Sequence, residues 1–362
     1  MKASWKKILF LLAVALLCFL FGRLNSGLYQ QPVGEVTAVH NHPAESETDE
    51  HGNQDSTVQQ ELTIRLLNRS NRVIKVDNTY TASQAESDRY RVHDQLLLKK
   101  LSGDYQVDMP KRDAVLFALT GLLVAGLFLA MKSRKFSFLM LSVLVNALLF
   151  LAVILWDSSA RSLPVLPVFS LLAIVLSALA LYFVLGWGVQ AMITWVATCV
   201  ATLLALLAMA LVIALTGAKG VHFETMAYVT QVPQPIFYAQ AVIGVLGAVM
   251  DESGDIVAGL FGLHREKSDR PFSDYFQGGL SIGREILGTL TNVLFMIFIA
   301  ETIPMVVLML RNGNNWSYIL DQTMNLGILQ TVVSALGIVW SVPVTAFLTA
   351  KVLTKKRGGV ES

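Results

Sequence analysis

Residues 189–215 read VQAMITWVATCVATLLALLAMALVIAL, a run without one charged side chain. A bilayer core about 30 Å thick is crossed by about 20 mostly apolar residues of α-helix, so this run is long enough to span it. Seven further apolar runs occupy 8–22, 114–131, 137–156, 166–186, 236–262, 285–310 and 326–350. The sequence therefore predicts a membrane all-α bundle of about eight transmembrane helices.

The composition agrees with lipid as the main solvent. Of the 362 residues, 54% are hydrophobic and only 15% are charged, whereas soluble proteins carry about 25% charged residues. The net charge of +2 and the lack of a basic, aromatic-interleaved patch argue against a nucleic-acid partner. Cys18 and Cys199 lie in apolar runs, where they predict neither a disulfide framework nor a metal pair.

Known enzyme motifs give no support for catalysis. The chain has no HExxH, P-loop or GxGxxG pattern, so no cofactor or metal is expected. Residues 279–283, GLSIG, match the G-x-S-x-G pattern of serine hydrolases, which acts on a strand–turn–helix elbow. Here the pattern begins an apolar run. We therefore expect no enzyme.

The N-terminal third is predicted to divide into three parts. Residues 1–24 form an uncleaved anchor, since no small-residue cleavage site follows the apolar run. Residues 25–57 are polar and acidic, which predicts a disordered linker; a loose metal site at His40, His42 and His51 is the alternative. Residues 58–110 contain short β-rich runs between turn residues and predict a small β-domain.

Basic residues divide the later loops into two groups. One group contains the positive clusters Lys132, Arg134 and Lys135; Arg265, Lys267 and Arg270; and Lys351, Lys355, Lys356 and Arg357. The positive-inside rule places these clusters in the cytoplasm. The prediction is a cell-membrane protein with both termini inside, residues 25–110 outside, a seven-helix domain over 111–357 and a cytoplasmic tail at 358–362.

Three stretches carry a family resemblance: DNTYTASQAESDRYRVHDQ at 77–95, GVLGAVMDESGDI at 244–256 and GGLSIGREILGTLTN at 278–292. Together they resemble the YibE/F family of bacterial multi-pass membrane proteins, and the external domain is similar to the YibE branch. The resemblance implies fold and location, and it transfers no reaction. Expected partners are the lipid bilayer and either a second YibE/F-like membrane protein or further copies of the chain.

Carboxylates inside an apolar run are the strongest functional signal. Counted from His264 at 1.5 Å per residue, Asp251 and Asp255 lie about 20 Å and 14 Å deep. A charge at such depth costs at least about 2.5–3.5 kcal/mol. Their spacing of four places both on one helical face with the small residues Gly244, Ala248, Gly259 and Gly262. We expect this face to pack inside the bundle, with Glu252 directed elsewhere.

Other polar residues extend the candidate site. Arg284 and Glu285 begin the next run, with Asn292 further in. Arg284 is expected either to pair with Asp255 or to anchor at lipid phosphate. Asn146 and Glu301 are single polar groups in other apolar runs; Asn146 is expected to hydrogen-bond a neighbouring helix, and Glu301 is either a second proton or cation station or an interfacial group.

The leading hypothesis is a transport-type membrane protein that binds protons or cations at these intramembrane carboxylates. The alternative is a structural or accessory membrane protein whose β-domain docks a partner and whose buried charges only specify packing. An intramembrane enzyme is the third and weakest reading.

Overall fold

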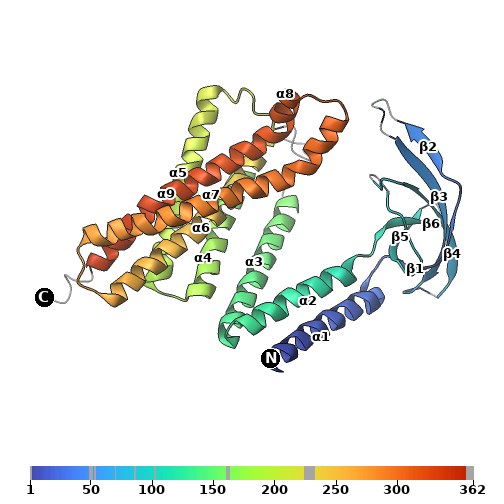
Figure 1. Ribbon diagram of the computed structural model, residues 1–362, viewed down its shortest axis with the longest axis horizontal. Helices are drawn as coiled ribbons and strands as arrows, with labels where there is room; N and C mark the ends of the chain where they lie inside the picture. Colours follow the sequence, from blue (N-terminus) through green and yellow to red (C-terminus); the bar gives the residue numbers. More distant parts are fainter. Residues whose placement is uncertain are drawn as a thin grey trace. The chain divides into compact units, whose positions relative to one another are not determined.

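The computed structural model divides the chain into two compact units, Met1–Phe136 and Ser137–Ser362, which we call the N-terminal and C-terminal units (Figure 1). The residues that the structure describes are 2–48, 52, 54–69, 71–84, 87–101, 103–159, 164–223 and 233–355.

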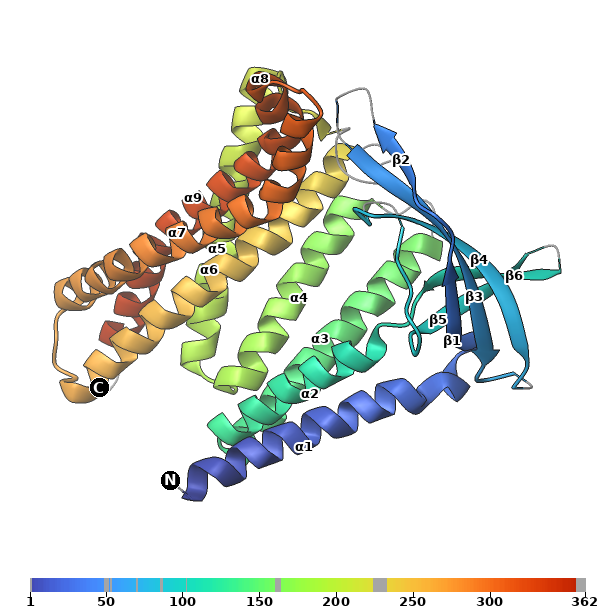
Figure 2. The ribbon, with the colours of Figure 1, turned by 45° about the vertical axis from the view of Figure 1, so that its right-hand side comes forward.

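The N-terminal unit combines two helices with a curled antiparallel sheet (Figure 2). Its elements are α1 (Lys2–Leu24), the 3-10 turn η1 (Asn25–Leu28), β1 (Val33–Asn41), β2 (Glu45–Thr48), β3 (Gln54–Leu66), β4 (Val73–Thr81), β5 (Gln95–Leu101), β6 (Asp104–Pro110) and α2 (Asp113–Ala130).

Strand β3 organises the sheet by pairing with β1, β2 and β4, while β5 joins β1 to β6. Leu62, Ile64 and Leu66 alternate with more exposed residues along β3 and are buried, as expected for a strand with one face on a core. The core of the sheet consists of Val36, Leu62, Ile64, Leu66, Val76, Tyr90, Leu96 and Leu98. The predicted β-domain is therefore present.

Its N-terminal boundary differs from the prediction. Residues 25–57 were expected to be a disordered linker, but η1, β1 and β2 lie within this range and β3 starts in it. Val33 and Val36 of β1 are fully buried, and Val36 pairs with Ile64 in the register of β3. Strand β1 is held in the sheet because Val36 joins the core cluster and because β1 pairs on both sides, with β3 and β5.

Helix α2 also belongs with the N-terminal unit, whereas the sequence placed it in a seven-helix domain over 111–357. It packs along α1, and small residues permit the close approach. A Cβ atom added to Gly22 would lie 2.5 Å from Cα of Ala114, and one added to Gly121 would lie 2.5 Å from Sγ of Cys18. The two helices form a tight antiparallel pair, connected through the sheet at one end (Figure 2).

A polar junction links this helix pair to the sheet. The side chain of Lys111 is only 1% exposed, and its ammonium lies 3.0 Å from the carboxylate of Asp113. It also donates to the carbonyl of Gly22 and, at 3.2 Å, to Oε1 of Gln95. Asp113 accepts further hydrogen bonds from Asn25 and Tyr29. We call Lys111, Asp113, Gln95, Asn25 and Tyr29 the Lys111 junction.

The C-terminal unit is helical. Its elements are α3 (Ser133–Ser159, which begins at the end of the first unit), α4 (Val165–Leu185), α5 (Val189–Thr216), α6 (Pro233–Glu266), α7 (Phe272–Arg311), α8 (Trp316–Tyr318), the π-helical segment η3 (Ile319–Met324) and α9 (Asn325–Lys355).

Helix α6 is central to this unit because it packs against α4, α5, α7 and α9. Helix α9 approaches α6 closely, since a Cβ atom added to Gly337 would meet Val245 at 2.8 Å and Val249 at 2.9 Å. Ala201 and Ala205 of α5 belong to the same core cluster. Because Gly337 has no Cβ atom, α5, α6 and α9 pack closely together at this point.

Seven helices in the described part of the chain are long and apolar enough to cross a membrane, whereas eight spans were expected. Helix α6, which contains Asp251, Glu252, Asp255 and Glu266, is not among them. The apolar side chains of α1, α2 and α3 are mostly exposed, which suits lipid and would be unfavourable in water. These features support a membrane protein of helical type with a β-domain.

Candidate carboxylate site

Glu252, near the middle of α6, is fully buried, and neither carboxylate oxygen has a hydrogen-bond partner among the described residues. Its neighbours on the same helical face, Val249 and Ile256, both pack toward α9, Val249 near Gly337 and Ile256 in a cluster with Val342. This spacing of three and four residues puts the Glu252 carboxylate on the α9 side of α6.

Hydroxyl groups surround this level of the bundle. On α9, Ser341, Thr345 and Thr349 are each fully buried, and Thr345 donates to Oγ of Ser253, the residue next to Glu252, at 3.1 Å. Ser341 and Thr349 donate to backbone carbonyls of their own helix, so their oxygens retain lone pairs that can accept a proton donor or bind a cation.

Helix α5 adds a second row of buried hydroxyls, Thr194, Thr198 and Thr202. Thr194 and Thr198 donate to carbonyls four residues earlier, whereas Oγ of Thr202 is buried with no partner among the described residues. Helices α5, α6 and α9 thus combine one unpaired carboxylate with a set of hydroxyl oxygens, an arrangement suited to holding a proton or a small cation.

Asp251 and Asp255 take the opposite orientation to the one expected. Both are exposed at the surface of the chain, and the predicted inward face is wrong. The inward face of α6 instead carries the bulkier Val245, Val249 and Ile256. Gly337 on α9 provides the space for the two valines. Of the four acidic residues in this helix, Glu252 is the buried one, although we expected it to point elsewhere.

The polar residues of α7 are also exposed: Arg284, Glu285, Asn292 and Glu301. In the part of the chain that the structure describes, Arg284 forms no ion pair with Asp255, so that expected pair is absent. Asn146 on α3 is half-buried, and its Oδ1 atom is buried without a partner among these same residues. These side chains are not brought together with Glu252.

The described residues contain no group of three or more His, Cys, Asp and Glu side chains that could hold a metal ion. The rings of His40 and His42 lie 5.2 Å apart on and just after β1, while His51, expected as their third member, lies outside the described residues.

Two family models match the chain. The model described as YibE/F-like protein matches residues 119–355, and the model described as YibE/F family N-terminal domain matches residues 27–109. The chain belongs to the YibE/F family. No curated protein and no solved structure matches it.

The first match contains Glu252 and all of α5, α6 and α9, so the carboxylate site lies in the YibE/F-like part of the chain. The G-x-S-x-G pattern also falls there, inside α7, and its glycines serve packing: a Cβ atom on Gly279 would lie 2.6 Å from that of Ala346, and one on Gly283 would lie 2.5 Å from Val342. In this YibE/F protein the pattern is a helix-packing motif, not a nucleophile elbow.

Proposed function

We propose that this YibE/F protein is a transport-type membrane protein in which Glu252 binds a proton or a monovalent cation as part of the mechanism. The observation that carries the proposal is a fully buried carboxylate without a partner among the described residues. An uncompensated charge in such a place costs several kcal/mol. Glu252 must therefore be neutralised, and a titrating proton or a bound cation does so reversibly.

The donor set favours a proton or a monovalent ion over Ca²⁺. Calcium takes six to eight oxygen ligands and usually several carboxylates, whereas one carboxylate and hydroxyl oxygens such as those of Ser253 and Thr345 surround this level of α6. A single negative charge neutralised by a single positive charge leaves the bundle without net charge at this level.

The first experiment concerns the site itself. Dicyclohexylcarbodiimide, an apolar reagent, modifies protonated carboxyl groups, and peptide mapping by mass spectrometry locates the adduct. We expect an adduct at Glu252 that decreases at high pH or with added Na⁺ or K⁺, disappears in Glu252→Gln and persists in the neighbouring control Asp251→Asn.

An adduct confined to Asp251 or Asp255, or labelling of Glu252 that neither pH nor cations change, would contradict the proposal. In the second case Glu252 would be a permanently neutral packing residue. That outcome would favour the accessory role, in which the β-domain docks a partner and the helices serve as its anchor.

A second copy of the chain is proposed as a partner on the exposed face of α6. Asp251 and Asp255 are exposed there, and charged groups at membrane depth are found facing protein or water and not lipid. In a background without Cys18 and Cys199, oxidation should crosslink Ala258→Cys between copies and leave the buried control Ala241→Cys uncrosslinked. Monomer alone under both conditions would oppose a second copy at this face.

We further propose that the protein lies in the bacterial cell membrane with both termini in the cytoplasm and residues 25–110 outside. The distribution of Lys and Arg between loops supports this orientation. It places the sheet of the N-terminal unit where a partner outside the membrane can reach it.

A further inference from the structure

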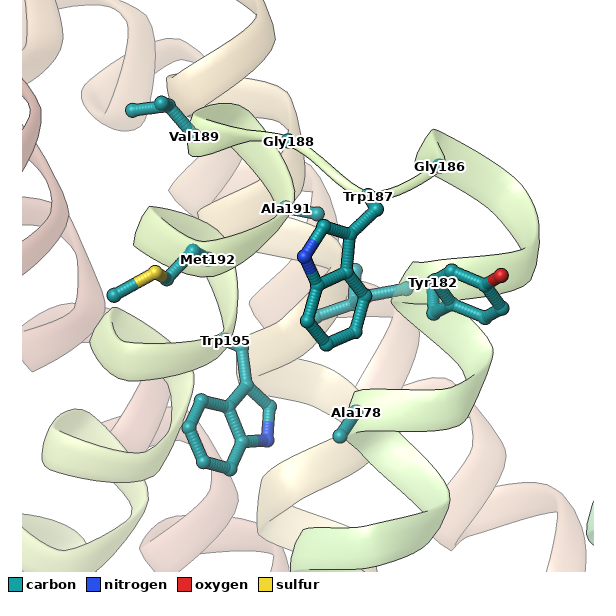
Figure 3. Close-up of a pocket in the computed structure, with 10 residues that line it drawn as sticks. Ala178, Tyr182, Gly186, Trp187, Gly188, Val189, Ala191, Met192 and Trp195 are labelled. Carbon is teal, nitrogen blue, oxygen red and sulfur yellow. The ribbon is translucent and has the colours of Figure 1, made fainter.

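A cavity of about 530 Å³ lies between α4 and α5 at the turn that joins them (Figure 3). The turn is short, Gly186, Trp187 and Gly188, and its two glycines contribute no side chain to the mouth of the cavity. Ala178 on α4 and Ala191 on α5 widen the space between the helices. This volume falls in the range of sites that hold a small organic molecule or part of a lipid.

Two tryptophans divide the cavity into a mouth and a floor. Trp187 belongs to the turn, is 92% exposed and packs edge-on against Tyr182 with ring centroids 5.4 Å apart. Trp195 lies six residues into α5, about 9 Å along the helix axis from Val189. Both indoles project into the gap between the helices (Figure 3).

The chemistry of the lining differs between these two ends. At the floor, the indole N–H of Trp195 donates to the carbonyl of Ile174 at 3.2 Å, so it is already satisfied and presents only apolar surface. The lining residues of the cavity include no acidic or basic side chain. At the mouth, the indole N–H of Trp187 is available to a ligand, whereas the hydroxyl of Tyr182 points away from the gap (Figure 3).

We infer that this cavity binds one acyl chain of a phospholipid, with the ester region of that lipid at Trp187. Both helices are long and apolar enough to span a bilayer, so the turn between them lies near the boundary of headgroups and acyl chains, where Trp and Tyr are enriched. The apolar floor accommodates the chain, and the indole N–H of Trp187 donates to an ester carbonyl. The uncharged lining makes the site insensitive to headgroup charge.

Shape and hydrogen bonding must retain this lipid, because moving an acyl chain from the bilayer to an apolar cavity removes no further surface from water. Filling the cavity should therefore release the lipid selectively. Ala191→Trp places an indole in the cavity, and Leu203→Trp places the same side chain on a part of α5 that is 57% exposed. The second variant is the matched control.

The test uses the full chain purified in detergent and washed extensively, with bound phospholipid counted by mass spectrometry. We expect about one phospholipid per chain in the wild type and the control, without preference between zwitterionic and anionic headgroups. Retention should fall about tenfold in Ala191→Trp, which corresponds to about 1.4 kcal/mol.

A spectroscopic measurement keeps the inference testable if Ala191→Trp fails to fold. In a chain whose only tryptophans are Trp187 and Trp195, the two that line the cavity, phospholipid brominated in its acyl chain should quench the fluorescence at one equivalent per chain. Equal retention in all variants, or quenching that requires a large excess of lipid, would overturn the inference. Loss of a protein oligomer in Ala191→Trp with no change in lipid would assign the cavity to a neighbouring helix instead.

Discussion

Replacement of Lys111 by methionine tests whether the Lys111 junction holds the sheet to the α1–α2 helix pair. The Lys111 side chain is 1% exposed and that of Asp113 is 15% exposed, so the substitution leaves a mostly buried carboxylate without its cation. Breaking a buried pair in this way costs about 3–5 kcal/mol. Asp113 keeps hydrogen bonds from Asn25 at 2.8 Å and Tyr29 at 2.9 Å, which favours the lower end, about 3 kcal/mol.

Hydrogen exchange measured by mass spectrometry over residues 95–110 should detect this loss of stability as faster exchange in β5 and β6. The double variant Lys111→Met/Asp113→Asn removes the stranded charge and should recover about half of the loss. Lys75→Met is the control, since Lys75 is 73% exposed in its pair with Glu61 and exposed pairs contribute about 0–1 kcal/mol. Equal effects of Lys111→Met and Lys75→Met would refute the reasoning.

Three further predictions concern packing, pH and topology. Gly337→Leu should destabilise the C-terminal unit by about 1–3 kcal/mol through overpacking against Val245 and Val249. Gly247→Leu is the control, since a side chain at Gly247 would enter open space. Thermal unfolding in detergent measures the stability of both variants. Burial of the Glu35 carboxyl opposes its ionisation, but hydrogen bonds from Arg65 and His93 and the charge of Arg23 outweigh it and lower its pKa from 4.5. The contribution of Glu35 to stability is thus present above pH 4.5 and is lost as the pH falls through its lowered pKa in the folded protein. An acid titration of the free energy of unfolding should therefore show a weaker pH dependence in Glu35→Gln. An unchanged profile would contradict this. In a background without Cys18 and Cys199, an impermeant thiol reagent added to intact cells should label Ser46→Cys and spare Ser133→Cys and Ser268→Cys; labelling at Ser268→Cys would reverse the topology.

The helices were largely predictable from the sequence because burial in lipid requires only long apolar runs. The runs at 114–131, 166–186 and 189–215 correspond to α2 (Asp113–Ala130), α4 (Val165–Leu185) and α5 (Val189–Thr216) within one or two residues. Strand β1 was missed because most of its side chains are polar or small. It has a bulge between Val36 and Ala38, which interrupts the alternation that would otherwise indicate a strand.

The orientation of α6 was the main error at the candidate site. Small residues beside Asp251 and Asp255 resemble a helix-packing face, but packing depends on both partners. Gly337 on α9 accepts the bulkier face of Val245 and Val249, which turns Glu252 inward. The sequence did contain a signal for the inward position of Glu252, its spacing of seven, three and four residues from Val245, Val249 and Ile256. Gly337, however, lies on a helix distant in sequence, so its contact with this face could not be predicted.

Infrared difference spectroscopy of the reconstituted protein tests the central claim most directly, because the C=O stretch of a protonated carboxylic acid is distinct from the bands of a carboxylate. We predict a protonated carboxyl band that shifts or disappears when the pH is raised or when Na⁺ or K⁺ is added. It should be absent in Glu252→Gln and present in Asp251→Asn. A difference band that remains in Glu252→Gln and is lost in Asp251→Asn would contradict the assignment of the proton or cation site to Glu252.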